Sequence, residues 1–146
     1  MKRFVFHLQA VLDLRSRRER DAQRSLAQLN RSQVELQARL RQAEMARRAV
    51  MTTWRQELVG TLDISDLRSQ AAQARSQDHR ARQLVLELAA LEPQVASARE
   101  TLGKATAERR AMEYLRDRAR TRWLRSIRRQ SRRDEAEQTA SGRVSI

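Results

Sequence analysis

Apolar residues recur along most of this chain in alternating steps of three and four positions. The first series runs, in order, through Leu8, Leu12, Arg15, Glu19, Ala22, Leu26, Leu29, Gln33, Leu36, Leu40, Ala43, Arg47, Val50 and Trp54. The second, in its own phase, runs through Leu67, Gln70, Ala74, Gln77, Ala81, Leu84, Leu88, Leu91, Val95, Ala98, Leu102, Ala105, Arg109, Met112, Arg116, Ala119 and Trp123. This heptad spacing is typical of helices that pack along a narrow seam. It predicts two long helices, over about residues 8–58 and 66–135.

The segment between the two series, about residues 59–65, has the composition of a turn. It contains Gly60, and either Asp63 or Ser65 could cap the following helix. If the chain folds back about Leu62, facing residues have numbers that sum to about 124, so that Leu40 faces Leu84 and other seam positions also coincide. The predicted fold class is therefore all-α, a long two-helix antiparallel coiled-coil hairpin with unequal arms.

Pro93 lies inside the second helical pattern, where it removes one backbone donor. We expect a kink near Pro93, because the heptad phase continues through it; a complete break into two helices is the alternative. The prediction is a single hairpin domain over residues 1–135, with a flexible C-terminal tail over 136–146. If the numbers of facing residues sum to about 124, residues beyond about Arg116 have no partner within the chain.

The composition supports an elongated helical protein. Aromatic residues make up only 3% of the 146 positions, and charged residues make up 34%. A chain with this composition has too few large apolar side chains for a globular core. The chain has no cysteine, which excludes disulfides and thiolate metal sites. Polar residues interrupt the apolar start of the chain, so we expect no export signal. No stretch approaches the roughly 18 apolar residues of a membrane-spanning helix.

Positive charge is concentrated near the end of the second helix. The net charge is +13, and nine arginines against one acidic residue lie in residues 116–133. We expect these arginines to be spread around the helix and to favour an acidic partner; the alternative is a solvated charge run. Trp123, Leu124 and Ile127 within the run argue against the alternative.

Polar residues in the seam, such as Arg15, Glu19 and Arg109, have two interpretations. They usually set the register of a coiled coil, and docking to a partner is the alternative. Trp54, near the turn, is either a core residue or an anchor for a partner.

Catalysis is not expected. The two histidines, His7 and His79, are far apart in the predicted hairpin, and no glycine-rich phosphate loop is present. We therefore predict no catalytic residue, no cofactor, no metal site and no small-molecule substrate. Nucleic-acid binding is a more serious possibility than catalysis, because the isoelectric point of about 11.7 gives the chain the positive charge that phosphate groups attract. Because no recognisable reader motif is present, nucleic acid is the less favoured partner.

Three features of the chain occur together. The chain opens with Phe4, Phe6, Leu8, Val11, Leu12 and Arg15, a turn follows after about fifty residues, and a longer second helix contains Lys104, Glu108, Arg109, Glu113, Leu115 and Arg118. In these features the chain resembles the family of the flagellar export protein FliJ. The resemblance extends over nearly the whole chain. YscO-like stalk proteins of injection-type secretion systems share this architecture and remain an alternative.

The resemblance implies a cytoplasmic component of the flagellar type III export apparatus, associated peripherally with the inner membrane at the flagellar base. Its implied partners are the hexameric export ATPase, the cytoplasmic domain of the membrane export gate and, in some members, export chaperones. Proteins of this family resemble the stalk of rotary ATPases, with both chain ends inserted in the ring. The candidate partner-binding residues are Phe4, Phe6, Leu8, Arg15, Trp54, Arg116, Arg118, Arg120, Arg122, Trp123, Arg125, Arg128 and Arg129.

Overall fold

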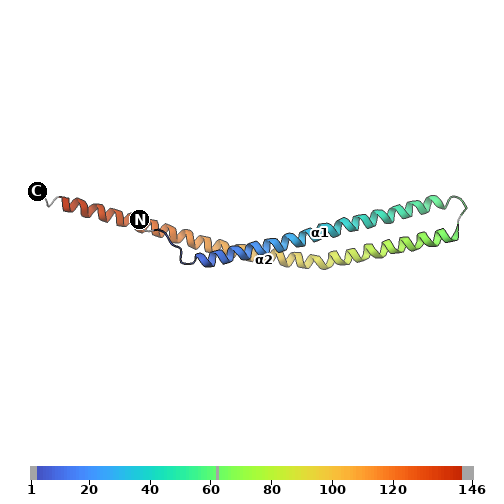
Figure 1. The fold of residues 1–146 in the computed structure, drawn as a ribbon, viewed down its shortest axis with the longest axis horizontal. Coiled ribbons are helices and arrows are strands. Elements are labelled where there is room, and N and C mark those ends of the chain that lie inside the picture. The colour runs from blue at the N-terminus through green and yellow to red at the C-terminus, as the bar shows by residue number, and fades with distance from the viewer. Residues whose placement is uncertain (1–2, 62, 143–146) are drawn as a thin grey trace. The chain divides into compact units, whose positions relative to one another are not determined.

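The chain folds into two antiparallel helices that form a coiled-coil hairpin with unequal arms. The computed structural model describes residues 3–61 and 63–142. Helix α1 spans Gln9–Glu57, 49 residues, and helix α2 spans Ile64–Gly142, 79 residues (Figure 1). The described residues contain no strand. These observations confirm the predicted fold class.

The hairpin divides into two compact units, which are described separately. The terminal unit consists of residues 1–21 and 102–146, and the turn unit consists of residues 22–101. Each unit contains part of both helices. That residues 1–135 behave as a single domain stays a prediction.

Helix α2 begins with a side-chain cap. The Asp63 Oδ1 atom accepts a hydrogen bond of 2.9 Å from the backbone amide of Ser65, and the backbone amide of Leu67 donates to the Asp63 carbonyl at 3.1 Å. The backbone amide of Ser65 lowers the pKa of Asp63, because it stabilises the charged carboxylate. Of the two predicted candidates, Asp63 is therefore the capping residue.

The seam of the hairpin follows the two predicted series. Among the described residues, the buried side chains are those of Leu12, Glu19, Ala22, Ala43, Leu84 and Val95. All six are predicted seam positions, and none of the predicted seam residues of α2 is exposed. In the first series, two residues are exposed: Leu8, which directly precedes α1, and Arg47, which lies on α1. Because most seam residues are only half-buried, a few well-covered side chains supply much of the packing.

Contacts between the helices confirm the predicted register. In the turn unit, Arg47 Nη1 lies 3.6 Å from Asp78 Oδ1, a pair whose numbers sum to 125. In the terminal unit, Thr106 donates a hydrogen bond of 2.8 Å to Glu19, which gives the same sum. The other side-chain pairs across the seam have sums between 123 and 128, which bracket the predicted sum of about 124. The predicted fold-back point is therefore correct to within about two residues.

Helix α2 continues through Pro93, so the alternative of a complete break is wrong. Pro93 is exposed, where water can solvate the carbonyl that loses its donor. The neighbouring Gln94 side chain donates a 3.3 Å hydrogen bond to the carbonyl of Ala90. A kink at this position stays a prediction.

The predicted end of the second helix, near Glu135, needs correction. Helix α2 extends to Gly142, and residues 143–146 lie outside the described part. Thr139 Oγ1 donates to the carbonyl of Glu135 at 2.8 Å. The sequence here is rich in alanine, glutamate and glutamine, which favour helix even without tertiary contacts. Most of the predicted tail over residues 136–146 is thus helical, and its flexibility stays a prediction.

Two glycines should respond to alanine in opposite directions. Gly60, in the turn, has a φ of 157°, which L residues rarely adopt, so Gly60→Ala should lower the free energy of unfolding by about 1 kcal/mol. Gly103, inside α2, has open space where a Cβ atom would stand, so Gly103→Ala should raise it by about 0.5–1 kcal/mol. Urea unfolding followed by circular dichroism measures both. Equal effects of the two substitutions would contradict this assignment.

Candidate partner-binding site

The segment before α1 packs against the C-terminal part of α2 within the terminal unit. The Phe4 and Trp123 rings have centroids 5.7 Å apart and planes inclined by 54°. Figure 1 shows this segment, in dark blue, beside the orange part of α2. The expectation that residues beyond Arg116 have no partner is therefore wrong for Trp123. An extended chain advances about 3.3 Å per residue and a helix only about 1.5 Å, so a few extended residues reach far along α2.

A shallow groove brings several of the predicted residues together. It is lined by Arg3, Phe4, Val5, Phe6, Gln9, Arg116, Arg120 and Trp123. Phe4, Phe6 and Trp123 are half-buried, and Arg120 is exposed. Arg116 Nη2 lies 3.2 Å from the carboxylate of its neighbour Asp117. The groove thus combines aromatic rings with guanidinium groups at the same end of the terminal unit.

Most arginines of the C-terminal stretch lie on one side of α2. With 100° between successive residues, seven of them fall within an arc of about 140°. We call this surface the arginine face, and it consists of Arg118, Arg122, Arg125, Arg128, Arg129, Arg132 and Arg133. Arg120 and Trp123 lie on the opposite side. The expectation that the arginines are spread around the helix is therefore wrong. The angular positions of the residues on a helix, which follow from the sequence, are sufficient to identify the face.

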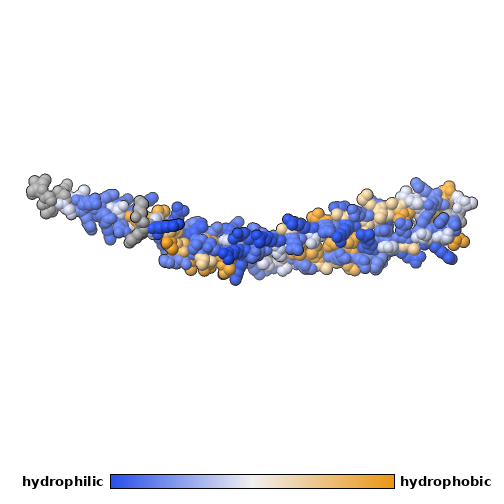
Figure 2. Space-filling model, in the orientation of Figure 1, coloured by the Kyte–Doolittle hydropathy of each residue, from blue (hydrophilic) through white to orange (hydrophobic). Residues whose placement is uncertain are grey.

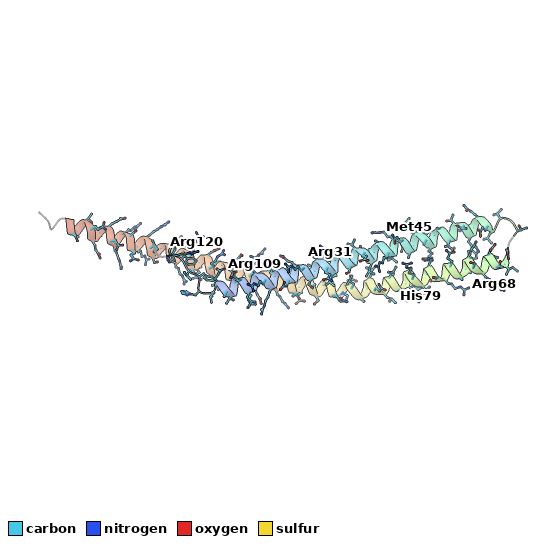
Figure 3. The ribbon with its side chains drawn as sticks, in the orientation of Figure 1. Arg31, Met45, Arg68, His79, Arg109 and Arg120 are labelled. Atoms are coloured by element: carbon cyan, nitrogen blue, oxygen red, sulfur yellow. The ribbon has the colours of Figure 1, made fainter. Side chains whose placement is uncertain are left out.

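The arginine face is exposed and electrostatically unsatisfied. All seven of its arginines are exposed. Figure 3 labels Arg120, which lies on the same stretch of α2 but outside this face. Within residues 3–61 and 63–142, none of the seven forms an ion pair with a carboxylate. Like charges three and four positions apart on a helix repel each other. An anionic partner would remove this repulsion.

A polar cluster joins the two helices of the terminal unit. The buried Glu19 carboxylate accepts hydrogen bonds from Arg109 and from Thr106, and Arg109 also donates to Glu113 at 2.5 Å. The contact with Arg109, more than that with Thr106, lowers the pKa of Glu19. These pairings agree with the register-setting interpretation of the polar seam residues.

Arg15, a predicted partner-binding residue, also contacts the opposite helix. Its guanidinium forms an ion pair with Glu108, and the side chain is half-buried. A partner that binds Arg15 would have to compete with Glu108. The prediction that Arg15 binds a partner stays a prediction.

An apolar stripe on α1 and its entry was not predicted as a partner-binding surface, apart from Leu8. It consists of Leu8, Val11 and Leu14, which are exposed at 44%, 37% and 47% and are spaced by three residues. Figure 2 shows apolar surface at the beginning of α1. On α2, Tyr114 and Leu115 are also exposed. Apart from Leu8, these residues stand outside the seam series, so the heptad spacing does not point to them.

Trp54 lies in the turn unit and is half-buried. Its indole Nε1 is shielded from solvent and has no hydrogen-bond partner among the described residues. Gln70 Oε1, on the opposite helix, is also shielded and unpartnered. The half-buried side chain with its shielded nitrogen agrees with the core interpretation of Trp54, while a role as an anchor stays a prediction.

Removal of the Phe4 ring should release the N-terminal segment from Trp123. The chain has two tryptophans, so Trp54→Phe leaves Trp123 as the sole indole fluorophore. In that background, Phe4→Ala should shift the emission to longer wavelength, because it removes an aromatic pair that contributes about 1 kcal/mol. Val59→Ala, in the turn and 87% exposed, is the control and should leave the emission unchanged. An unchanged spectrum for Phe4→Ala would show that the segment is not docked in solution.

Two further findings concern the described residues only. No group of three or more His, Asp or Glu side chains lies close enough to hold a metal ion. None of the described helices combines the length and the apolarity that crossing a bilayer requires.

Comparison with known proteins identifies the family. The family model described as "Flagellar FliJ protein" matches residues 4–143, nearly the entire chain. The search of curated proteins and the search of solved structures each returned no match. The match includes both the N-terminal segment and the arginine face. The chain therefore belongs to the family of the flagellar export protein FliJ.

Proposed function

We propose that this protein is the stalk of the flagellar export ATPase, and that its terminal unit binds the hexameric ring. Membership of the FliJ family, over residues 4–143, is the observation that carries the proposal, because it makes the chain a component of flagellar protein export. Our proposal goes beyond family membership in three respects: the role as a stalk, the ATPase ring as the partner, and the terminal unit as the part that binds it.

The surfaces of the terminal unit support this choice of binding end. Interfaces commonly combine apolar anchors with arginines. The apolar stripe of Leu8, Val11 and Leu14 offers exposed anchors, and the arginine face offers seven exposed guanidinium groups. Carboxylates on the ring would complement this charge. The groove between Phe4 and Arg120 belongs to the same unit.

The stalk would regulate hydrolysis without performing chemistry itself. A chain with one cationic face cannot contact all subunits of a symmetric ring equally. Subunits with different contacts would have different affinities for nucleotide, and a ligand shifts an equilibrium by its differential affinity for the two states. Binding across several subunits would also favour ring assembly. The protein would therefore promote both the assembly and the activity of the ATPase.

The proposal includes two further partner classes and a location. The stalk would couple the ATPase to the cytoplasmic domain of the membrane export gate, and export chaperones would bind it as well. This places the protein in the cytoplasm, peripherally associated with the inner membrane at the flagellar base. Family membership supports these partners as a class of export components.

Binding to the cognate ATPase tests the proposal directly. Size-exclusion chromatography of the ATPase with the full chain should show a complex of ring size. Deletion of residues 118–146 should abolish the complex, because it removes the arginine face and Trp123. Deletion of residues 138–146 is the control, since it retains both surfaces, and it should leave the complex intact.

Two outcomes would contradict the proposal. If the 118–146 deletion binds the ATPase as well as the full chain does, the terminal unit is not the binding end. If the full chain binds generic duplex DNA in a salt-sensitive manner and does not bind the ATPase, the chain is a nucleic-acid-binding protein.

A further inference from the structure

The arginine face is a cationic surface with almost no apolar component. Between Arg118 and Arg133, Thr121 is the one other residue in its arc of about 140°. A partner helix packs through apolar side chains that interdigitate along a seam, and this face has none to offer between its arginines. Its binding energy would therefore come from charge, which favours a partner that presents many anionic groups.

The chain itself occupies the opposite side of the first part of this stretch, around Trp123. Trp123 lies there, and the Phe4 ring packs against it at 5.7 Å. Arg120, on that side, lines the groove with Phe4. Around Trp123, a partner can therefore approach α2 only from the side of the arginine face. A flat surface fits this geometry, whereas the groove of a nucleic-acid duplex surrounds a helix on several sides.

Apolar groups stand at one end of the face. Tyr114 and Leu115 fall within the same arc, one turn before Arg118, and are 65% and 44% exposed. Tyrosine side chains are enriched at the level of lipid headgroups, because the ring is apolar and the hydroxyl is polar. An exposed tyrosine beside a row of arginines suits the boundary between water and a bilayer.

We propose that the arginine face binds the surface of an anionic phospholipid membrane. Clusters of four to eight Lys or Arg on one side of a helix bind anionic lipids, with roughly additive contributions. The helix would lie on the membrane, with its guanidinium groups on the phosphates and Tyr114 among the headgroups. This binding is independent of the ATPase. A ring that enclosed the same stretch would cover the face, so ring and membrane should compete for it.

Vesicle flotation with the purified full chain tests the proposal. The probes are vesicles of phosphatidylcholine alone and vesicles with about one third phosphatidylglycerol, whose anionic surface attracts basic segments. The chain should float with the anionic vesicles at about 0.05 M salt and not with the neutral ones. Binding should be lost at about 0.5 M salt, where screening is strong.

The deciding variant reverses three charges on the face, Arg122→Glu, Arg125→Glu and Arg129→Glu. It should weaken binding to anionic vesicles by about a hundredfold or more, since each arginine near the surface contributes several-fold. The matched control reverses three exposed arginines of the turn unit, Arg41, Arg48 and Arg80, and changes the net charge by the same amount. It should stay within a few-fold of the wild type. Circular dichroism verifies that both variants are helical, and the Arg→Gln triple variant replaces the first if it is not.

Several results would overturn the proposal. These are equal binding of neutral and anionic vesicles, no binding of anionic vesicles, and equal weakening by the two triple variants. Binding of duplex DNA that needs the arginine face, without binding of vesicles, would reassign the face to nucleic acid. Because the assay contains no ATPase, its failure leaves the proposed stalk function untouched, and failure of ring binding leaves the membrane proposal untouched.

Discussion

Replacement of Leu84 by alanine should lower the free energy of unfolding by about 3 kcal/mol. Leu84 is 6% exposed and is one of five buried apolar side chains among the described residues. A two-helix seam has no second layer that could fill the resulting cavity, so both the lost burial and the cavity contribute to the cost. Urea unfolding, followed by circular dichroism at the helix band, measures the change.

Leu86→Ala is the matched control for this prediction. Leu86 lies two residues away on the same helix and is 69% exposed, so its truncation should change the unfolding free energy by less than about 0.5 kcal/mol. Similar losses for Leu84→Ala and Leu86→Ala would mean that the seam does not run through Leu84. The register derived from the contacts would then be wrong.

The second large effect is expected at Glu19, whose carboxylate is buried against Arg109 and Thr106. Glu19→Gln removes the charge that these donors stabilise, and it leaves the Arg109 guanidinium with Glu113 as its carboxylate partner. Loss of one member of a buried charge pair is costly, because the other charge remains desolvated. The melting temperature at neutral pH should fall by several degrees.

The stabilising contribution of the Glu19 carboxylate depends on pH. Because contact with Arg109 lowers the pKa of Glu19 in the folded protein, its stabilising contribution is complete above its ordinary value of 4.5. The contribution is lost as the pH falls below 4.5 and through the folded-state value. The difference in melting temperature between wild type and Glu19→Gln should therefore shrink with acidification.

The exposed Glu44 on α1 provides the control for this titration. Glu44→Gln should leave the melting temperature nearly unchanged at every pH, since removal of an exposed charge has a small effect. A constant difference between wild type and Glu19→Gln from pH 7 to the acid limit would show that the Glu19 charge does not stabilise the fold.

The helical hairpin could be predicted from the sequence because its stability depends on a periodic seam. The two heptad series predict the helices, the turn and a register correct to within about two residues, as the pairs Arg47 with Asp78 and Glu19 with Arg109 show. The exposed Leu8 departs from the series because it precedes the first residue of α1. Periodicity is a local property of the chain, so it survives without knowledge of tertiary contacts.

The site was predictable only in part. Heptad reasoning stops where the helix stops, so it missed the extended segment that brings Phe4 onto Trp123. It identified Glu19 and Arg109 as polar seam residues, but which side chains pair depends on axial offsets of a few ångströms that spacing alone does not determine. The arginine face could have been found from the sequence, because its arc follows from helical angles alone.

The stalk assignment is tested most directly by the rate of ATP hydrolysis by the cognate flagellar export ATPase. The rate should be measured with and without this protein, at two salt concentrations, alongside sizing for ring assembly. If this protein is the stalk, the full chain should accelerate hydrolysis and promote ring formation, and salt should weaken both effects because the arginine face contributes to binding. Unchanged hydrolysis together with no ring formation at either salt concentration would contradict the stalk assignment.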